Sequence, residues 1–460
     1  MHGRGILWRH VLRKICYQSS TALLRSAFDY TRFGARMRAC SLIFFRECGL
    51  ARREVAVRYF PARLIGRIPP EVKLIFSSIG RAVFLWLSAF ASPWTAGRSL
   101  SGTLLVIVAW PFFCLLQLLH WIGFGLDEIF FRGWRRVEVH APLFVLGPPR
   151  SGTTHLHHVL SMDDKSTTFR TWECLFGLSV TGRMLLLGLG RLDRLLGHPF
   201  ARVGGWAGRR FLSGMDDVHP FAMDAPEEDF LALMPVMQCF ILVVVFPRAD
   251  WLWRTARLDT EADAGQRRRL MRFYRACVQK HMYVFGTGKR FLSKNASFSG
   301  MAESLLETFP DARIVSTTRD PKKTVPSQLS SIEPGLAAVG IERIGQALRE
   351  RFVEQLLFYY LHLEALATSR PDRIVIVDND ELRENLEAVV RASLTALGLD
   401  VSPQFDQALA EAGRRSRGFS SKHAYTLADY GLSESTIEQR FEAVYRNRTF
   451  GRHRVSATDV

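Results

Sequence analysis

The chain has 460 residues, a formal net charge of +17 and a hydrophobic content of 48%. This length accommodates one large catalytic domain with an appendage, or two modest domains. A basic balance favours polyanionic partners such as nucleic acid, an anionic membrane face or a phosphorylated ligand. The seven cysteines are scattered without a CxxC pair, which excludes a disulfide framework or a zinc site and suits a reducing compartment.

The positive charge is concentrated at the N-terminus. Residues 1–81 contain 16 Lys and Arg against 4 Asp and Glu, a net charge of +12, so the other 379 residues carry only +5. This basic region does not resemble a cleavable signal peptide, because no apolar stretch follows directly on a short basic start. We therefore expect a basic N-terminal region, 1–81, and a catalytic body of nearly balanced charge that binds no nucleic acid.

Two uncharged runs follow, and together they predict a membrane-associating segment over residues 82–136. The first run, 82–97, has 16 residues, and the second, 99–126, has 28. A spanning helix needs about 20 apolar residues, so the second run is long enough despite Pro111.

Cationic residues flank the apolar runs on both sides: Arg81 before them, and Arg132, Arg135 and Arg136 after them. Positive charge at both ends favours a hairpin, or a helix that lies in the interface, with both ends on the cytoplasmic face. The alternative is an apolar helical subdomain that packs on the rest of the chain. We expect residues 82–126 to contact the membrane.

From about residue 140 the pattern changes to short apolar runs that alternate with helical segments. It predicts strands at 142–146, 312–317 and 373–377, and the segment 290–293 leads into a second loop. Helices are expected to begin near Gly152 and Pro321 and to cover 346–368. Such alternation implies a parallel sheet covered on both faces. The predicted fold class is α/β, with a P-loop-like three-layer core over residues 140–450 and a helical, membrane-associating region before it.

The segment Gly147–Thr154 (GPPRSGTT) combines a strand end, a tight glycine-containing loop and a helix start. In this design backbone N–H groups and the helix N-terminus point at a bound oxyanion. Gly152 lets the backbone approach closely, and Arg150 adds a multidentate cation. Hydroxyl donors come from Ser151, Thr153 and Thr154. The alternative is an ordinary turn rich in small residues.

This loop differs by one residue from the GxxxxGK[ST] loop of nucleoside triphosphatases. Gly147 and Gly152 match that motif, but Thr153 stands where the lysine would be. A kinase needs the lysine for its β- and γ-phosphates. The loop therefore argues against ATP hydrolysis and for a different phosphorylated ligand.

A second segment, Thr318–Ser330 (TRDPKKTVPSQLS), follows the predicted strand 312–317. Arg319 stands at the strand end, and Ser327 lies eight residues later on the next helix. Because the chain turns at Asp320–Pro321, the two side chains can hold one phosphate from two sides. The alternative is an ordinary strand–turn–helix with a solvated arginine.

Together the two motifs resemble those of the sulfotransferases that use 3′-phosphoadenosine-5′-phosphosulfate (PAPS). The resemblance implies that Arg150, Ser151, Gly152, Thr153 and Thr154 bind the 5′-phosphosulfate, and that Arg319 and Ser327 bind the 3′-phosphate. The cytosolic branch usually has lysine where this chain has Arg150. Arginine there is similar to the bacterial and tyrosylprotein branches.

Three further segments extend the resemblance over about residues 142–447. Phe291–Ala296 (FLSKNA) is similar to the LKNP segment of the bacterial group, although the proline is missing. His219–Glu228 resembles a family segment with a histidine before a glutamate pair. Lys422–Leu432 (KHAYTLADYGL) resembles the C-terminal signature of mycobacterial menaquinone sulfotransferases. With the apolar region, this implies sulfuryl transfer to a hydroxylated small-molecule or lipid-like acceptor, with the catalytic domain in the cytoplasm.

Sulfuryl transfer needs a base for the acceptor proton and cations for the leaving phosphate. His219 is the first candidate base, and a capping histidine is the alternative. Glu173 is the second, because relatives place a glutamate base in this region, and pairing with Arg170 is the alternative. Lys294 is expected at the bridging or leaving oxygen. No metal is predicted, since the acidic residues 224–229 are explained by a helix start.

Two other functions remain open from the sequence. One is a nucleotide-dependent phosphotransferase. The other is a membrane-anchored binding protein that keeps a catalytically dead pocket for PAPS.

Overall fold

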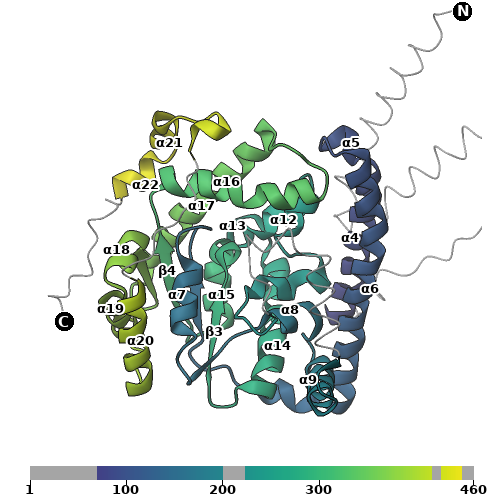
Figure 1. Ribbon diagram of the computed structural model, residues 1–460, viewed down its shortest axis with the longest axis vertical. Coiled ribbons are helices and arrows are strands. Elements are labelled where there is room, and N and C mark those ends of the chain that lie inside the picture. The colour runs from purple at the N-terminus through teal and green to yellow at the C-terminus, as the bar shows by residue number, and fades with distance from the viewer. Residues whose placement is uncertain (1–69, 200–222, 417–425, 448–460) are drawn as a thin grey trace, which may run out of the picture. The chain divides into compact units, whose positions relative to one another are not determined.

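The computed structural model describes residues 70–199, 223–416 and 426–447, all of which belong to one unit of the chain, 69–460 (Figure 1). Its core is a five-stranded sheet in the order β2-β3-β1-β4-β5, and every neighbouring pair is parallel. The strands are β1 (Leu143–Leu146), β2 (Ser166–Thr167), β3 (Arg290–Lys294), β4 (Arg313–Thr318) and β5 (Ile374–Asp378). The predicted α/β class is confirmed.

The three predicted strands correspond to β1, β4 and β5, and each agrees within about one residue at its ends. The segment 290–293, expected to lead into a loop, forms strand β3. Strand β1 (LFVL) is buried throughout, as expected for a parallel strand that is covered on both faces. Strand β2 was not predicted, because it has only two residues, both polar, and pairs with β3 through Ser166 and Arg290.

Helices cover both faces of the sheet and make three layers (Figure 1). Alternate β1 residues point to opposite faces: Phe144 and Leu146 enter one apolar cluster, and Leu143 and Val145 enter the other. On the Leu143 face lie α7 (Thr153–Leu160), α18 (Asn379–Glu384), α19 (Leu386–Ala396) and α20 (Pro403–Ser416). The Phe144 cluster includes residues of α14 (Ala264–Phe285), α15 (Ala302–Thr308), α16 (Pro321–Ala338) and α17 (Gln346–Ser369).

Ten further helices complete the α/β part of the described residues. They are α8 (Thr171–Phe176), α9 (Val180–Leu195), η2 (Asp229–Val236), α11 (Leu242–Val245), α12 (Asp250–Thr255), α13 (Leu258–Glu261), η3 (Ala296–Met301), η4 (Ala428–Tyr430), α21 (Glu434–Arg440) and α22 (Glu442–Asn447).

The predicted apolar segment forms a helical hairpin. Its elements are α4 (Pro70–Phe90), α5 (Ser92–Thr95), α6 (Leu100–Phe130) and the short η1 (Arg132–Arg136). Two indole N–H groups join its arms: Trp86 donates to the carbonyl of Ile107 (3.0 Å), and Trp110 donates to that of Ala82 (2.9 Å). By length and composition, Val72–Phe90 and Leu100–Phe130 could each cross a membrane.

The hairpin also packs against the α/β core. The Trp121 indole donates to the carbonyl of Pro235 in η2 (3.1 Å). Near the end of α6, buried Asp127 pairs with Lys280 Nζ of α14 (2.8 Å) and accepts from the backbone N–H of Val180 (2.9 Å). One side of the hairpin is therefore part of the protein interior.

Candidate active site

The loop Gly147–Thr154 connects β1 to α7 as predicted, and its two glycines have left-handed backbone angles. The φ angles are 141° at Gly147 and 99° at Gly152. A Cβ atom on Gly152 would lie 2.2 Å from Oδ1 of Asn379, and one on Gly147 would lie 2.3 Å from the carbonyl oxygen of Thr317. Both positions therefore need glycine for backbone angle and for space.

Arg150 lies at the tip of this loop and also has a positive φ angle, 68°. For a residue other than glycine such a conformation costs about 1–3 kcal/mol and is characteristic of ligand-binding loops. Its side chain is held by the second motif, because Arg150 Nε donates to Ser327 Oγ at 3.1 Å. The two residues are 177 positions apart in the chain.

The second motif has the predicted strand–turn–helix geometry. Arg319 follows β4 directly, and Asp320 caps α16 by accepting from the backbone N–H of Lys322 (2.9 Å). Arg319 Nη1 donates to the carbonyl of Arg150 (3.3 Å), so Arg150, Arg319 and Ser327 converge.

One donor of this cluster has no protein partner. The Nε atom of Arg319 is buried and makes no hydrogen bond within the described part of the chain. Burial lowers the pKa of Arg319, because it removes water from the guanidinium. A half-buried guanidinium whose buried Nε has no partner among the described residues fits an anionic ligand.

The hydroxyl-bearing residues of the loop have different environments. Ser151 is fully buried, and its hydroxyl donates to the carbonyl of Pro148 (2.6 Å) and accepts from the Thr317 hydroxyl (2.7 Å). Its side chain therefore ties the loop to β4. Thr153 is buried and Thr154 is exposed in the first turn of α7, where backbone N–H groups have no partner within the helix.

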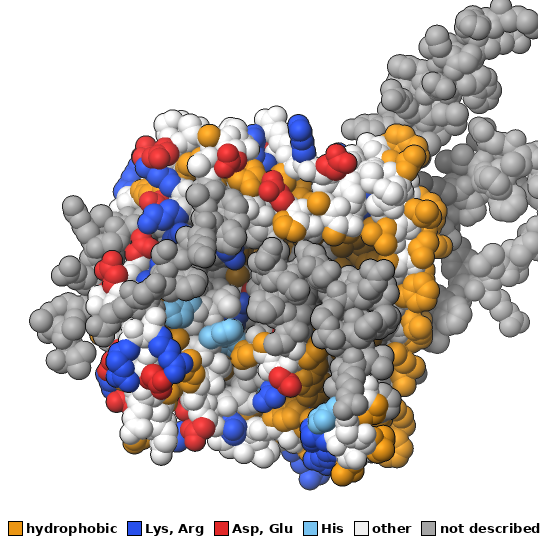
Figure 2. All heavy atoms as spheres, in the orientation of Figure 1, with side chains coloured by type: hydrophobic (Ala, Val, Ile, Leu, Met, Phe, Trp, Pro, Cys, Tyr) orange, Lys and Arg blue, Asp and Glu red, His pale blue; other side chains and the backbone are white. Residues whose placement is uncertain are grey.

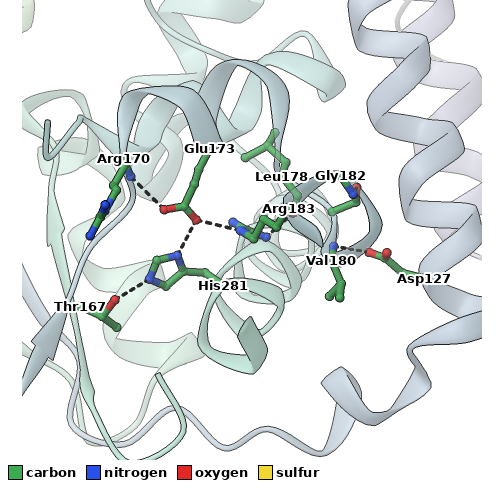
Figure 3. Close-up of polar contacts among 10 residues, drawn as sticks. Asp127, Thr167, Arg170, Glu173, Leu178, Val180, Gly182, Arg183 and His281 are labelled. Atoms are coloured by element: carbon green, nitrogen blue, oxygen red, sulfur yellow. Dashed lines mark hydrogen bonds and ion pairs between the residues drawn. The ribbon is translucent and has the colours of Figure 1, made fainter. Parts of the chain in front are cut away.

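Glu173 lies on α8 and is completely buried. Its Oε2 accepts from Arg183 Nε and from His281 Nδ1, both at 2.7 Å, as Figure 3 shows. The expected alternative was a pair with Arg170. Only the backbone N–H of Arg170 reaches Glu173 (3.2 Å), and its side chain bonds to Asp224 (3.3 Å).

These contacts set the charge of Glu173. Burial alone would raise the pKa of the carboxyl, but His281 and Arg183 outweigh it and lower that pKa to about 2. Burial lowers the pKa of His281. We therefore assign a neutral imidazole that donates from Nδ1 to Glu173 and accepts at Nε2 from the Thr167 hydroxyl (2.9 Å).

A cavity of about 330 Å³ lies beside this cluster. Its lining includes Thr167, Arg170, Glu173 and His281. The sequence offered no sign of the Arg183 and His281 contacts, because these residues stand 10 and 108 positions from Glu173 and belong to no local motif.

Lys294 ends β3, and its nearly buried ammonium pairs with Glu228 (2.5 Å). This contact joins two of the segments that carry the family resemblance. The helix start expected among the acidic residues 224–229 is found at Asp229, where η2 begins with Glu228 at its N-cap. Parts of two predicted motifs lie outside the described residues: 219–222, which include His219, and 422–425, which include Lys422.

No cluster of three or more His, Cys, Asp or Glu side chains that could hold a metal occurs within 70–199, 223–416 and 426–447.

Residues 142–403, more than half of the chain, match the model of the Sulfotransferase family. The chain belongs to this family. The match spans the loop 147–154, the segment 318–330 and the Glu173 cluster, and membership makes the chain a sulfotransferase, which moves a sulfuryl group from a donor. Family membership therefore favours the predicted enzyme over the phosphotransferase and over the inactive binding protein.

Curated relatives agree with this assignment. The omega-hydroxy-beta-dihydromenaquinone-9 sulfotransferases Stf3 of Mycobacterium bovis and Mycobacterium tuberculosis are each 27% identical over 310 residues, which cover 65% of this chain and 71% of theirs.

Two solved structures share the fold. Sulfotransferase STF1 of Mycobacterium tuberculosis has a TM-score of 0.58 at 20% identity and covers 83% of this chain and 96% of its own. Sulfotransferase STF9 of Mycobacterium avium has a TM-score of 0.59 at 18% identity and covers 77% and 87%.

Proposed function

We propose that this sulfotransferase moves the sulfuryl group of PAPS to a hydroxyl of a hydrophobic or lipid-like acceptor. The observation that carries the proposal is the contact between Arg150 Nε and Ser327 Oγ (3.1 Å). It joins the loop expected at the 5′-phosphosulfate to the motif expected at the 3′-phosphate. A donor with both groups matches such a double site, whereas a nucleotide without a 3′-phosphate would use only half of it.

On the donor side, we assign Arg150, Gly152, Thr153 and Thr154 to the 5′-phosphosulfate. Arginine supplies a fixed positive charge, and the N-terminus of α7 supplies backbone N–H donors. Ser151 supports them by holding the loop to β4.

The 3′-phosphate is assigned to the second motif. Ser327 offers its hydroxyl, and Arg319 offers the buried Nε that has no partner within the described residues. An anion at this guanidinium would offset the cost of its desolvation.

In the reaction, a bond forms between the acceptor oxygen and sulfur, and the bond between sulfur and the 5′-phosphate oxygen breaks. The acceptor proton passes to a base, and adenosine 3′,5′-bisphosphate leaves. We propose that Arg150 and Lys294 neutralise the leaving phosphate. Lys294 is held in position by its 2.5 Å ion pair with Glu228.

His219 is our preferred base, and Glu173 is the second candidate. A carboxylate whose pKa lies at about 2 accepts a proton weakly at neutral pH. This favours an anchoring role for Glu173, through Arg183 and His281. If His219 is the base, kcat/KM of the parent falls below a pH near the ordinary histidine pKa of about 6.5. The variant His219→Ala is expected to lose this fall in kcat/KM at low pH, whereas Glu173→Gln is expected to keep it.

The lipid-like acceptor is supported by two observations. The curated relatives carry a hydroxylated menaquinone in their names, and two helices of this chain are long and apolar enough to enter a membrane. We therefore propose membrane association through residues 82–126 with the catalytic domain on the cytoplasmic face.

The test is a transfer assay with ³⁵S-labelled PAPS and a membrane lipid extract. The proposal predicts label in the organic phase that depends on both enzyme and extract. Transfer only to water-soluble acceptors would contradict the lipid-like acceptor. Absence of transfer, together with ATP-dependent labelling of the extract by γ-³²P, would contradict the sulfuryl donor.

A further inference from the structure

Helix α6 is amphipathic in the opposite sense to a helix of a water-soluble protein. Most of its polar side chains face the protein: Thr103, Gln117, His120 and Asp127 are buried, as are Gly102 and Gly123. Most of its large apolar residues face outward, and their exposed fractions reach 76% at Leu100, whereas Val106 and Trp110 are buried. The outward-facing residues are Leu100, Leu104, Leu105, Val108, Phe112, Leu115, Leu118, Leu119, Ile122, Ile129 and Phe130.

Helix α4 exposes a second apolar stripe. Residues at helical spacing on its outer side are open, whereas Leu85 and Ala89 on its inner side are fully buried. The exposed stripe consists of Val72, Phe76, Ile79, Val83, Leu87 and Phe90.

Helix α9 adds a third stripe, which lies outside the segment that the sequence marked as membrane-associating. Its start is fixed to α6, because Asp127 accepts from the backbone N–H groups of Val180 and Thr181 (2.9 and 2.8 Å). Its inner side buries Arg183 against Glu173. Its outer side exposes Met184, Leu185, Leu189, Leu192 and Leu195.

We call the outward sides of α4, α5, α6 and α9, with Leu196, the apolar face. Of the 28 large hydrophobic side chains exposed in the described residues, 24 belong to it. Figure 2 shows hydrophobic side chains in a band along α4 and α6. A soluble monomer rarely exposes a continuous apolar patch larger than a few hundred Å², so this face needs an apolar partner.

Cationic side chains border the apolar face. Arg135 and Arg136 are exposed after α6, and Arg191 and Arg194 are exposed on α9 beside its leucines. The two acidic residues in the last turn of α6 are paired: Glu128 with Arg135 (2.9 Å) and buried Asp127 with Lys280 (2.8 Å). Arginines at the edge of an apolar surface match anionic lipid headgroups, because their stems lie along the apolar region while their charges stay in water.

We propose that the apolar face is a docking surface that seats α4, α6 and α9 flat in one leaflet of an anionic membrane. This proposal rests on the proposed function, because a docked membrane surface would bring the active site close to a lipid-like acceptor. It adds α9 as a membrane-contacting element. It also replaces a spanning arrangement by one in which the helices lie parallel to the bilayer.

The contacts of α6 explain why the helix lies flat. The protein contacts one side of this helix along its whole length. The Ser99 N–H before it donates to the carbonyl of Gly340 (2.8 Å), the Trp121 indole donates to that of Pro235 (3.1 Å), and Asp127 pairs with Lys280 (2.8 Å). A span needs about 20 residues surrounded by lipid. Detachment of α6 would place Gln117, His120 and Asp127 in hydrocarbon, where polar groups are costly.

The test uses the full-length protein and phosphatidylglycerol-containing vesicles at about 0.5 M salt, where screening suppresses purely electrostatic binding by the basic N-terminal region. The variant Leu185→Glu/Leu192→Glu places two charges on the apolar face of α9. Gln404→Glu/Gln407→Glu places the same charges on exposed positions of α20, away from the hairpin (Figure 1). We expect about a tenfold lower vesicle partition coefficient for the α9 variant and an unchanged coefficient for the α20 variant.

Titration with adenosine 3′,5′-bisphosphate serves as the fold check and is expected to be unchanged in both variants. Equal vesicle binding by the α9 variant and the parent would overturn the proposal. The proposal would also be overturned if the parent were a dimer and the α9 variant were a monomer with unchanged vesicle binding, because the face would then bind a second copy of the chain. If the parent fails to bind adenosine 3′,5′-bisphosphate but the α9 effect is present, the proposed function fails and the docking surface stands.

A labelling experiment distinguishes flat from spanning helices. Thr95→Cys and Arg135→Cys place exposed thiols near the two ends of α6. With a membrane-impermeant maleimide outside the vesicles, the flat arrangement predicts that both thiols react above the background of the parent. Protection of one end only would show that α6 spans the bilayer.

Discussion

The donor side of the active site and the Glu173 cluster differ in how their parts are distributed along the chain. On the donor side, Gly147–Thr154 and Arg319–Ser327 are short segments whose backbones determine most of the geometry, and one contact, Arg150 to Ser327, joins them. The Glu173 cluster takes single side chains from β2, α8, α9 and α14. The geometry of the proposed donor site is therefore set mainly by local motifs, whereas the charge of Glu173 depends on the tertiary fold.

This difference predicts that changes in the Glu173 cluster affect stability first. Glu173→Gln leaves Arg183 buried without its counter-charge, which costs about 3–5 kcal/mol in the free energy of unfolding. Chemical denaturation at pH 7 measures the loss. The exposed pair of Glu138 and His140 supplies the control, since Glu138→Gln is expected to change stability by less than about 1 kcal/mol.

The same variant has a distinct pH dependence. The folded-state pKa of Glu173 is depressed to about 2 from an ordinary value of 4.5. Its contribution to stability is therefore fully present above pH 4.5 and is lost as the pH falls towards 2. The difference between parent and Glu173→Gln should narrow over that range. A difference that stays constant down to pH 2 would show that Glu173 is not ionised in the folded protein.

Changes on the donor side should instead affect catalysis and leave the fold intact. Arg150 is exposed at the loop tip, and Arg150→Ala is expected to lower kcat/KM for PAPS by about 10²- to 10³-fold. The kcat/KM of Arg150→Lys should lie between those of the parent and Arg150→Ala, because lysine keeps the charge but lacks the planar donor array of arginine. Steady-state kinetics measure the effect, with exposed Arg248→Ala as control. If the parent and Arg150→Ala had equal kcat/KM for PAPS, Arg150 would not be part of the donor site.

The smallest expected effect is at the edge of the donor site. Ser327→Ala removes one hydroxyl from the assigned 3′-phosphate position and should raise KM for PAPS roughly tenfold. Ser331 lies one turn later on α16, and its hydroxyl donates to the carbonyl of Gln328 within its own helix (2.8 Å), so Ser331→Ala is the matched control. An equal KM for both variants would separate Ser327 from donor binding.

The parts of the structure that could be predicted from the sequence are those that depend on residues close together in the chain. Strand β1 (LFVL) is a continuous apolar run, and the loop after it needs glycines at 147 and 152, so both could be recognised directly. Strand β2 was missed because pairing with β3, rather than its two polar residues, makes it a strand.

The environment of Glu173 and the outer face of α9 could not be predicted in the same way. Ion pairing with Arg183 and a hydrogen bond from His281 arise only when α8, α9 and α14 pack together. A leucine stripe such as that of α9 is the same in sequence whether it faces a protein core or a membrane. In this fold α9 turns buried Arg183 towards the protein interior, and its leucines are exposed on the opposite side.

The most direct test of the donor assignment is calorimetric titration of the parent with adenosine 3′,5′-bisphosphate, adenosine 5′-monophosphate and ATP. If Arg319 and Ser327 form a 3′-phosphate site joined to the loop, adenosine 3′,5′-bisphosphate should bind at least about tenfold more tightly than either of the others, because charge-assisted hydrogen bonds contribute about 1.5–3 kcal/mol. Equal affinity for the bisphosphate and the monophosphate, or tighter binding of ATP, would contradict the account.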